Sequence, residues 1–520
     1  MTARVAIIGS GPGALACAWQ LIARGLRPVV LDAGETLPAP TAALVNELRA
    51  TWGHWRPAAV DAVTRNPTLK GQPLPKKLVF GSDFLHGHGR RHSPLVNSSF
   101  VDPTFALGGY TVAWGGAMLP IRTTDMNGWP IGEDELADGF AQVLARLPFS
   151  GSDDGLSAEF PLYGARAQQL EPTSQSRSVM RRLAALARPG LFVSGQARVA
   201  VKASDCRYCG MCLSGCPFGV IQTFDQFFPG LAAQGLIEYR GGVVVTRLAD
   251  TADGVRVHAV NRHNGPLPDQ HFDRVFLAAG AIGSTRIALE SMQLYDVDVD
   301  MLDSQKFAVP LLVPDTATSE PGAGNTLPAV FVDMRLPSTA AHWTHLQISS
   351  FSHYALQAMK QRMKLGPLPL HGLARPLTSR LMVGWAGLHS DHSDRFRLRL
   401  LRAHQHGRPL LKLQALPTDT TRQTTRRAMA EMRAQLRAAG ILALTPGAVI
   451  GPPGAGFHFG ASLPMQASPT HPLHTDTHGR PNGWRHVHVV DSSVFPTIPA
   501  TTMVLTIMAN AWRIAARAAL

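Results

Sequence analysis

The sequence predicts an α/β protein with at least two folded units, and three observations lead to this prediction. The first is a length of 520 residues with 45% hydrophobic content, which is enough to bury more than one core. The second is an N-terminal order of apolar strand, glycine-rich turn, helix and second strand. The third is the middle region, roughly residues 300 to 450, where strand patterns precede an amphipathic helix at 418–439.

The composition excludes several classes of protein. The 48 glycines and 39 prolines follow no period, which argues against both collagen-like and plainly disordered chains. We find no internal repeat, no heptad run and no apolar segment long enough to span a bilayer. The chain opens "MTARVAIIGSGPG" and enters a strand without a charged leader or cleavage site. We therefore expect a cytoplasmic protein, unless it leaves the cell already folded alongside a partner.

The chain is basic, since Lys plus Arg exceed Asp plus Glu by 49 − 36 = 13. The densest stretches are "RFRLRLLRAHQHGRPLLK" (395–412), which alternates like a strand, and "TRRAMAEMRAQLRAAG" (425–440), which has the pattern of an amphipathic helix. No aromatic residues that could stack on bases accompany these arginines. Solvent-facing arginines are therefore favoured over a nucleic-acid groove.

The N-terminal stretch "RVAIIGSGPGALACAWQLIARGLRPVVLDAG" has the order of a dinucleotide-binding unit. Gly9, Gly11 and Ala14 follow a strand and open an alanine-rich helix, and the next strand ends at Asp32. Glycines permit the tight turn and let a pyrophosphate approach the helix N-terminus, while the acid can accept hydrogen bonds from a ribose. This stretch predicts a dinucleotide site and leaves FAD and NAD as alternatives.

Four further segments carry a family resemblance. They are "LGGYTVAWGG" (107–116), "NGWPIGEDELADGF" (127–140), "DRVFLAAGAIGSTRIAL" (273–289) and "HVHVVDSSVFPTIPATTMVLTIMANAWRIA" (486–515). In this order, together with the N-terminal unit, they resemble the motifs of the glucose–methanol–choline (GMC) oxidoreductases. The resemblance is nearest to the branch of bacterial gluconate, fructose and FAD-linked glucose dehydrogenases.

This resemblance implies a discontinuous Rossmann-type FAD-binding domain and an α+β substrate domain with an antiparallel sheet. It divides the chain into FAD-binding segments at 1–149, 195–300 and 455–520, a peripheral insertion or cap at 150–194, and a substrate domain at 301–454. The residues that it places against FAD are Gly9, Gly11, Gly13, Ala14, Asp32, Gly108, Gly109, Thr111, Trp114, Gly115, Gly116, Val245, Ala279, Gly280 and Asp491.

Four of the five cysteines lie in one short loop, "CRYCGMCLSGCPFG" (206–219). Cys206, Cys209, Cys212 and Cys216 reproduce the ferredoxin spacing, in which thiolates hold iron–sulfur clusters. Structural zinc is the alternative, but zinc sites usually pair two short-spaced knuckles across a longer loop. Disulfides are less favoured in a chain without an export signal. The loop therefore predicts an iron–sulfur cluster.

The cluster type stays open between [3Fe–4S] and [4Fe–4S]. In the dehydrogenase branch named above, three cysteines spaced x5 and x3 hold a [3Fe–4S] cluster, and Cys206, Cys212 and Cys216 have that spacing. Cys209 is then either a fourth ligand or a spare. Because a flavin accepts two electrons and a cluster one, a cluster beside FAD suits a dehydrogenase that passes electrons to an external acceptor or a partner subunit.

The catalytic residues follow from the resemblance of "GFHFGASLPM" (456–465) to the family's histidine motif. His458 takes the place of the base that faces the flavin, although Gly460 comes one position early. Thr502 stands where the family has a second His or Asn, and a threonine is a poor base at neutral pH. The histidine-rich stretch "HSDHSD" (389–394) is interpreted as a polar turn between strands.

Three functions remain as alternatives on the sequence. The favoured one is an FAD- and iron–sulfur-dependent dehydrogenase that oxidises a hydroxyl group of a sugar, a sugar derivative or another alcohol. The second is a flavin-dependent lyase without net redox, and the third is a non-catalytic flavoprotein that relays electrons. Only the first predicts that a hydroxylated substrate reduces the flavin without oxygen.

Overall fold

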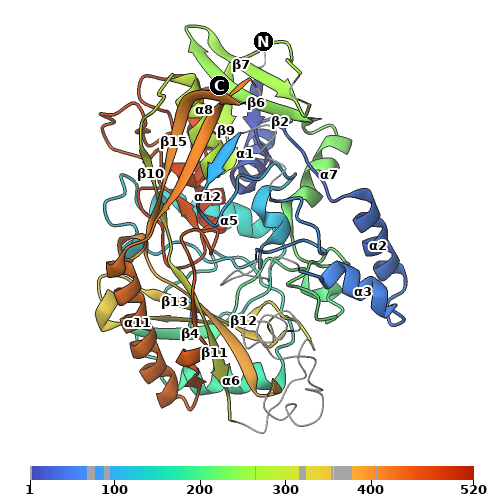
Figure 1. Ribbon diagram of the computed structural model, residues 1–520, viewed down its shortest axis with the longest axis vertical. Helices are drawn as coiled ribbons and strands as arrows, with labels where there is room; N and C mark the ends of the chain where they lie inside the picture. The colour runs from blue at the N-terminus through green and yellow to red at the C-terminus, as the bar shows by residue number, and fades with distance from the viewer. Residues whose placement is uncertain are drawn as a thin grey trace.

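The computed structural model describes residues 3–66, 76–86, 94–263, 265–314, 324–352, 355, 378–405 and 407–520. The chain forms two parts that lie end to end (Figure 1). The upper part in that view holds both termini and a parallel sheet, and the lower part holds a large antiparallel sheet flanked by helices. This architecture confirms the predicted fold class.

The parallel sheet brings together segments from both ends and the middle of the chain. Its five strands have the order β20–β9–β1–β2–β5. Their bounds are β1 Val5–Ile8, β2 Val29–Asp32, β5 Glu238–Gly241, β9 Arg274–Leu277 and β20 Val487–Val489. β1 and β2 are fully buried along their length, as expected for strands covered on both faces. In register, Ile7 lies between Val30 and Phe276.

Apolar helices cover this sheet. α1 (Pro12–Ala23) packs on α12 (Val504–Arg517), which in turn packs on α5 (Asp134–Arg146). α1 has proline at its first position, where a missing N–H does no harm, and small alanines along its buried side. α7 (Phe227–Ala233) precedes β5, and α8 (Gly280–Ser291) follows β9. The first and last helices of the chain thus share one core.

Two further sheets flank the parallel one, one of three strands and one of five. The first has the order β6–β7–β8 and consists of Val243–Thr251, Gly254–Asn261 and Gln270–Phe272. The second has the order β19–β10–β15–β16–β3 and consists of Phe459–Gly460, Val299–Asp303, Arg395–Gln405, Arg408–Leu416 and Leu95–Asn97. In the second sheet β19, which directly follows His458, pairs with β10 in antiparallel register.

The large antiparallel sheet has the order β17–β11–β14–β13–β12–β4, with β18 also paired to β11. Its strands are Leu442–Ala443, Lys306–Leu312, Leu381–Gly387, Thr344–Ser350, Pro328–Met334, Phe192–Gln196 and Val449–Ile450. α6 (Ser174–Ala184) and α11 (Asp419–Ala438) cover it. α6 buries Val179 and Leu183 in the core of this layer. This helix lies within the stretch 150–194, which the sequence predicts to be a peripheral insertion or cap.

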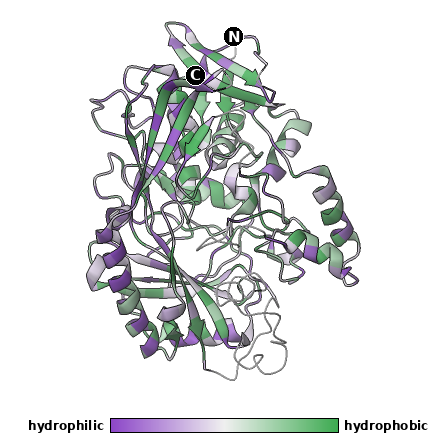
Figure 2. Ribbon diagram, viewed as in Figure 1, coloured by the Kyte–Doolittle hydropathy of each residue, from purple (hydrophilic) through white to green (hydrophobic). Residues whose placement is uncertain are grey.

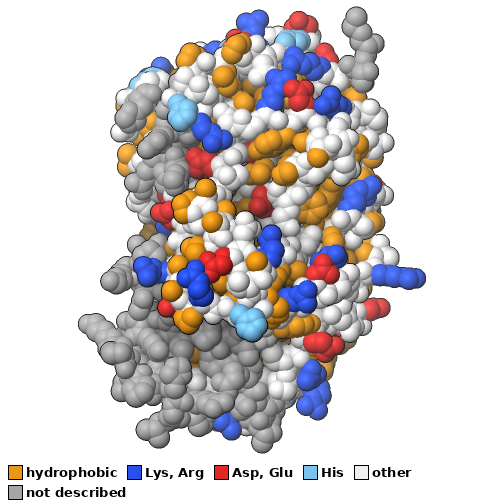
Figure 3. Space-filling model, turned by 90° about the vertical axis from the view of Figure 1, so that its right-hand side faces the viewer, with side chains coloured by type: hydrophobic (Ala, Val, Ile, Leu, Met, Phe, Trp, Pro, Cys, Tyr) orange, Lys and Arg blue, Asp and Glu red, His pale blue; other side chains and the backbone are white. Residues whose placement is uncertain are grey.

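The two basic stretches are a strand and a helix, as predicted. β15 buries Phe396, Leu398 and Leu400, while Arg397 and Arg399 pair with Asp298 and Asp300 at the start of the adjacent strand β10. The outward side of α11 is hydrophilic (Figure 2). The face that carries α2 (Ala39–Ala50) and α3 (Pro57–Thr64) mixes basic, acidic and apolar side chains (Figure 3).

Hydrophobic residues concentrate in the strands and on the inward sides of the helices (Figure 2). Within the described residues, no helix has the length and apolar character needed to cross a membrane.

Candidate active site

One large cavity lies between the two parts of the molecule. It has a volume of about 1500 Å³. Its lining includes the glycine turn after β1, the N-terminus of α8, the segment 455–459 and residues of β11, β13 and β14. Single drug-sized ligands occupy roughly 300–1,000 Å³. The space is therefore large enough for an extended dinucleotide together with a small substrate.

The glycine turn before α1 packs tightly against the ends of two strands. A Cβ on Gly13 would lie 2.2 Å from the carbonyl oxygen of Val490, and one on Gly9 would lie 2.5 Å from that of Ala278. A Cβ on Gly11 would meet no protein atom within 4 Å, and Gly11 lines the cavity. Two of the glycines thus serve packing, and Gly11 leaves room for a phosphate at the helix N-terminus.

This difference predicts opposite behaviour of two alanine variants. Gly13→Ala forces a backbone displacement and should destabilise the protein by about 1–3 kcal/mol or more. Gly11→Ala should keep the melting temperature of the FAD-free protein while weakening FAD binding, because its methyl group enters the cavity. Thermal melting of the FAD-free protein and FAD content after purification measure the two effects. Equal melting temperatures for the two variants would contradict this assignment.

Asp32 lies at the end of β2 beside the cavity and is 6% exposed. Its Oδ2 accepts hydrogen bonds from Ser10 Oγ at 2.7 Å and Tyr239 Oη at 2.9 Å. Burial raises the pKa of Asp32 to about 6, and these hydrogen bonds oppose the rise. At neutral pH the carboxylate is therefore ionised and held by two donors, with lone pairs left for ribose hydroxyls.

The N-terminus of α8 is the second helix end at the cavity. Ala279 and Gly280 lie there, and Ala279 N donates to Ser284 Oγ. Ser284 donates in turn to Asp491 Oδ2 at 2.5 Å, and Ser493 donates to Asp491 Oδ1 at 2.6 Å. Burial raises the pKa of Asp491. This network fixes the loop after β20 against the helix that faces the dinucleotide space.

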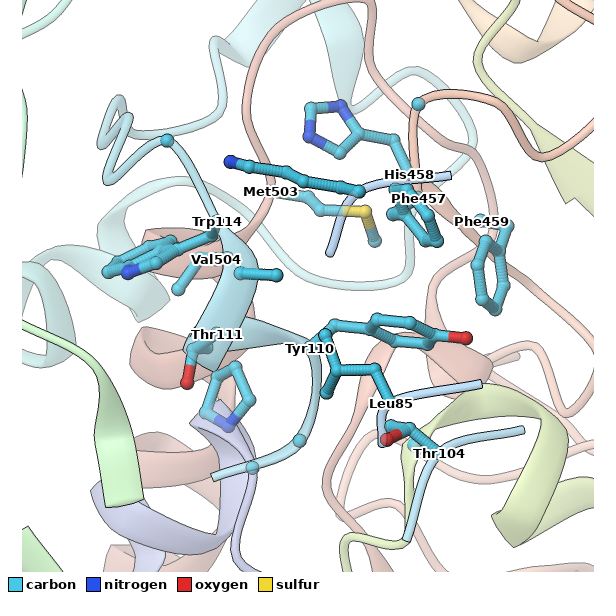
Figure 4. A pocket seen from close by; sticks show the side chains of 18 of the residues that line it. Leu85, Thr104, Tyr110, Thr111, Trp114, Phe457, His458, Phe459, Met503 and Val504 are labelled. Carbon is cyan, nitrogen blue, oxygen red and sulfur yellow. The ribbon is translucent and has the colours of Figure 1, made fainter. Parts of the chain in front are cut away.

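Most of the residues that the sequence placed against FAD line this one cavity. They are Gly9, Gly11, Gly13, Asp32, Gly109, Thr111, Trp114, Gly115, Val245, Ala279, Gly280 and Asp491. Three do not line it. Ala14 is buried in the core of α1, Gly108 N donates to Ser10 Oγ, and Gly116 packs near Ala200. Figure 4 shows Thr111 and Trp114 on the side of the cavity that faces His458 and Met503.

His458 reaches the cavity from the segment before β19 (Figure 4). Its Nδ1 is buried and makes no hydrogen bond, whereas the ring hydrogen-bonds the backbone of Thr501, the residue before Thr502. Burial lowers the pKa of His458 well below its usual value, and the nearby Lys306 and His345 lower it further. The imidazole is therefore neutral at physiological pH and able to accept a proton.

Thr502 also lines the cavity, and its hydroxyl oxygen accepts a hydrogen bond from Leu119 N at 2.9 Å. This contact ties the loop before α12 to the segment after Trp114. The threonine therefore has a structural partner, and its hydroxyl proton remains available for a substrate oxygen. It offers no base at neutral pH.

The cysteine loop borders the same cavity. Leu213, between Cys212 and Ser214, lines it. Cys206, Cys212 and Cys216 contact one apolar cluster that Trp114 also touches, whereas Cys209 contacts another that includes Leu48 and Val63 of α2 and α3. The loop is held to α2 by a hydrogen bond from Arg49 Nε to Pro217 O at 2.8 Å.

The four thiols are close enough to influence one another. Burial raises the pKa of Cys206, of Cys212 and, to about 12, of Cys209, and neighbouring cysteines of the loop raise all three further. Lys77 lines the cavity nearby; burial lowers its pKa to about 8, and Cys212 opposes that shift. Four thiolates are therefore unfavourable here without a bound cation among them.

The sulfurs are too widely spaced for a single metal ion. A tetrahedral zinc site with Zn–S bonds of about 2.3 Å would bring its sulfurs within roughly 3.8 Å of one another. In the part of the chain that the structure describes, the one set of His, Cys, Asp and Glu ligand atoms within 4.8 Å of one another is His342, His389 and Asp391. No three sulfurs of the loop lie that close together in the described residues.

The histidine set lies at the turn predicted for 389–394, where residues 390–392 form one helical turn between β14 and β15. The rings of His342 and His389 stack with centroids 3.6 Å apart and planes 7° from parallel. Asp391 N donates to His389 Nδ1, and His342 Nε2 lies 2.9 Å from Asp391 Oδ2. Parallel rings aim their lone pairs along separate planes, so no single ion lies in line with both.

Several residues of the site were not predicted from the sequence. Ser10 lies inside the glycine motif, and its role as a donor to Asp32 could have been inferred from that position. Tyr239, Asp303 and Lys306 come from segments without a motif. Only the tertiary fold brings Tyr239 to the dinucleotide turn, and Asp303 and Lys306 to the segment of His458.

Comparison with known proteins was made at the levels of sequence and fold. Residues 393–511 match the sequence model of a family described as GMC oxidoreductase. No curated protein matches significantly. Among solved structures, the chain is similar to "pyridoxine 4-oxidase from Mesorbium loti", with a TM-score of 0.61 and 15% identity over 99% of this chain and 98% of the other.

The likeness to the solved structure is one of fold, since the identity is low. The family match covers the C-terminal segment that carries His458, Asp491 and Thr502. The partial family match and the likeness of fold both agree with a dinucleotide-sized cavity beside His458.

Proposed function

We propose that this protein is a dehydrogenase that oxidises a hydroxyl group of a sugar, a sugar derivative or another alcohol, and sends the electrons through an iron–sulfur cluster to an external acceptor or a partner subunit. The observation that carries this proposal is the position of the cysteine loop. Leu213 of that loop lines the same cavity as Trp114 and His458. A group held by the cysteines would therefore lie next to the dinucleotide space.

Residues of the chain account for the binding of FAD. Gly11 and the N-termini of α1 and α8 offer backbone N–H groups to a pyrophosphate, and Asp32 offers its carboxylate to a ribose. Bound FAD supplies the acceptor for a hydride from the substrate carbon. His458, neutral and lining the cavity, would take the hydroxyl proton on the ring nitrogen that does not donate to the Thr501 backbone, as the carbon is oxidised.

Polar side chains from the antiparallel sheet support a polyhydroxylated substrate. The cavity wall formed by β13 and the segment after it carries Gln347, Ser349, Ser350 and Ser352. Amide and hydroxyl groups can both donate and accept hydrogen bonds, which matches the chemistry of sugar hydroxyls. Trp385 of β14 adds an apolar surface in the same cavity.

The cysteine environment favours the three-iron form of the cluster. Cys206, Cys212 and Cys216 contact one shared apolar cluster, and Cys209 contacts a different one. These three would then be the ligands and Cys209 the spare. Apolar surroundings also keep water away from such a cluster, and Lys77 offsets part of its negative charge.

Anaerobic reduction of the flavin tests the proposed reaction. The purified protein is mixed without oxygen with a panel of sugars, sugar acids and simple alcohols, and flavin absorbance is followed. We expect at least one polyhydroxylated compound to bleach the flavin, and oxygen to reoxidise it slowly. Rapid peroxide formation would indicate an oxidase instead, and bleaching by no member of the panel would count against the substrate class.

Metal analysis tests the cluster directly. Protein purified without oxygen should contain FAD together with iron and acid-labile sulfide, because the sulfurs are spaced too widely for one ion. Iron near three atoms per chain and an unchanged cluster in Cys209→Ser would support the three-iron form. Stoichiometric zinc without iron would contradict the proposal.

A further inference from the structure

A run of buried polar residues lies directly behind His458. Asp303, Ser304, Gln305 and Lys306 connect β10 to β11, and each is at most 3% exposed. Ser304 N donates to the backbone oxygen of His458 at 3.0 Å, and Asp303 pairs with Phe459 across the β10–β19 ladder. This segment therefore fixes the backbone that carries the histidine.

Lys306 joins this segment to the second loop of the site. Its Nζ donates to Ser304 Oγ at 3.0 Å and to the backbone oxygen of Ala500 at 3.0 Å. Ala500 lies two residues before Thr502. One buried ammonium group thus contacts both the segment behind His458 and the loop that carries Thr502.

Two glycines shape the channel that holds the lysine side chain. A Cβ on Gly456 would lie 2.4 Å from Lys306 Cγ, and one on Gly387 would lie 2.3 Å from Nζ. The channel therefore runs between the histidine segment and the end of β14. Such close contact holds the ammonium in one place near the imidazole.

We propose that Lys306 is a positioning residue that holds the two loops at the substrate end of the cavity and keeps His458 unprotonated. This inference rests on the proposed function, in which His458 is the base. It assigns to the lysine an electrostatic role: a fixed positive charge disfavours a second positive charge on the neighbouring ring.

The charged groups around the pair support this direction. Burial is the main cause of the lowered pKa of His458, Lys306 and His345 lower it further, and a hydrogen bond to the Thr501 backbone opposes them. His345 itself hydrogen-bonds Asp333, which also pairs with the buried Arg122. Burial lowers the pKa of Lys306 to about 7, and Asp303 opposes that shift.

The neighbouring carboxyl group of Asp303 does not cancel the effect of the Lys306 charge on His458 at acidic pH. Burial raises the pKa of Asp303 to about 7, with Asp394 raising it further and Gly454 N and Lys306 opposing. As the pH falls below 7, Asp303 takes up a proton while Lys306 becomes fully charged. The local charge is therefore most positive in the pH range where an ordinary histidine, with a pKa of about 6.5, would become protonated and could no longer act as a base.

The pH dependence of anaerobic flavin reduction tests this role, with a substrate that bleaches the wild-type flavin. In wild type, the acid limb of the rate profile should lie below the ordinary histidine value. Lys306→Met keeps the length of the side chain and removes its charge, so its acid limb should move up by about one pH unit or more. Lys306→Gln, which is also neutral, should show the same shift and serves if the Met variant fails to fold.

Ser304→Ala is the matched control, because it removes one hydrogen bond to Nζ and leaves the charge. Its acid limb should stay at the wild-type position. A purely structural role of Lys306 predicts lower rates at every pH with an unmoved limb, and that result in both lysine variants would overturn the inference. An unmoved acid limb would leave the proposed function intact. The proposed function fails by a different result, namely that no alcohol reduces the flavin of the wild-type protein.

Discussion

His458→Ala should bind FAD with wild-type stoichiometry and reduce it about a hundred- to ten-thousand-fold more slowly in anaerobic mixing with substrate. Oxidising an alcohol requires the hydroxyl proton to leave as the carbon gives up hydride. An imidazole nitrogen facing the cavity, on a ring whose pKa is held well below its usual value, supplies an unprotonated acceptor for it. The rate constant of flavin bleaching at saturating substrate measures this loss.

Thr502→Ala is the companion variant. It removes a hydroxyl that lines the cavity and leaves Leu119 N without its hydrogen-bond partner, so a modest loss of stability is expected as well. The rate of flavin reduction should fall less than in the histidine variant, because no proton acceptor is lost. Near wild-type bleaching by His458→Ala, with slow bleaching by Thr502→Ala, would place the base elsewhere.

Cys212→Ser should separate the two halves of the catalytic cycle. Reduction of the flavin by substrate should continue at nearly the wild-type rate, because the cysteine loop contributes Leu213 and no proton acceptor to the cavity. Turnover with a one-electron dye should be abolished, because the cluster that passes electrons onward cannot assemble. Stopped-flow bleaching and steady-state dye reduction measure the two halves on the same preparation.

Cys17→Ser provides the control for loss of a thiol. Cys17 is fully buried in α1, and it belongs to no thiol cluster in the described residues. That variant should keep iron and dye turnover, at some cost in stability. Parallel loss of flavin reduction and dye turnover in Cys212→Ser would mean that the loop is structural.

The local part of the nucleotide site could be predicted from the sequence, because its signals are short-range. Gly9, Gly11 and Asp32 lie within one strand–turn–helix–strand unit, where each residue's conformational or chemical requirement shows in its own neighbourhood. The cysteine loop is of the same kind, since its spacing is contained in eleven residues.

The support behind His458 could not be predicted in this way. In the sequence, nothing distinguishes Lys306 from an ordinary polar residue before a strand. Its burial depends on the pairing of β10 with β19 and of β11 with β14. Pairings between distant segments leave no periodic signal at either partner. The contact of the helix at 174–184 with the large sheet could not be predicted for a similar reason, since its apolar stripe does not reveal which sheet it covers.

The close contact between Gly13 and Val490 has a consequence for how the protein is made. The glycine turn is synthesised first, but the strand end that it packs against and the helix α12 that covers α1 come last. At about 5–20 residues per second, the ribosome reaches Val490 roughly 25 to 100 s after it starts. For that time β9 lacks its outer neighbour β20, and α1 lacks the helix α12 that packs on it. Truncation of the chain before Val490 should therefore abolish nucleotide binding at the glycine turn, although the two lie far apart in the sequence.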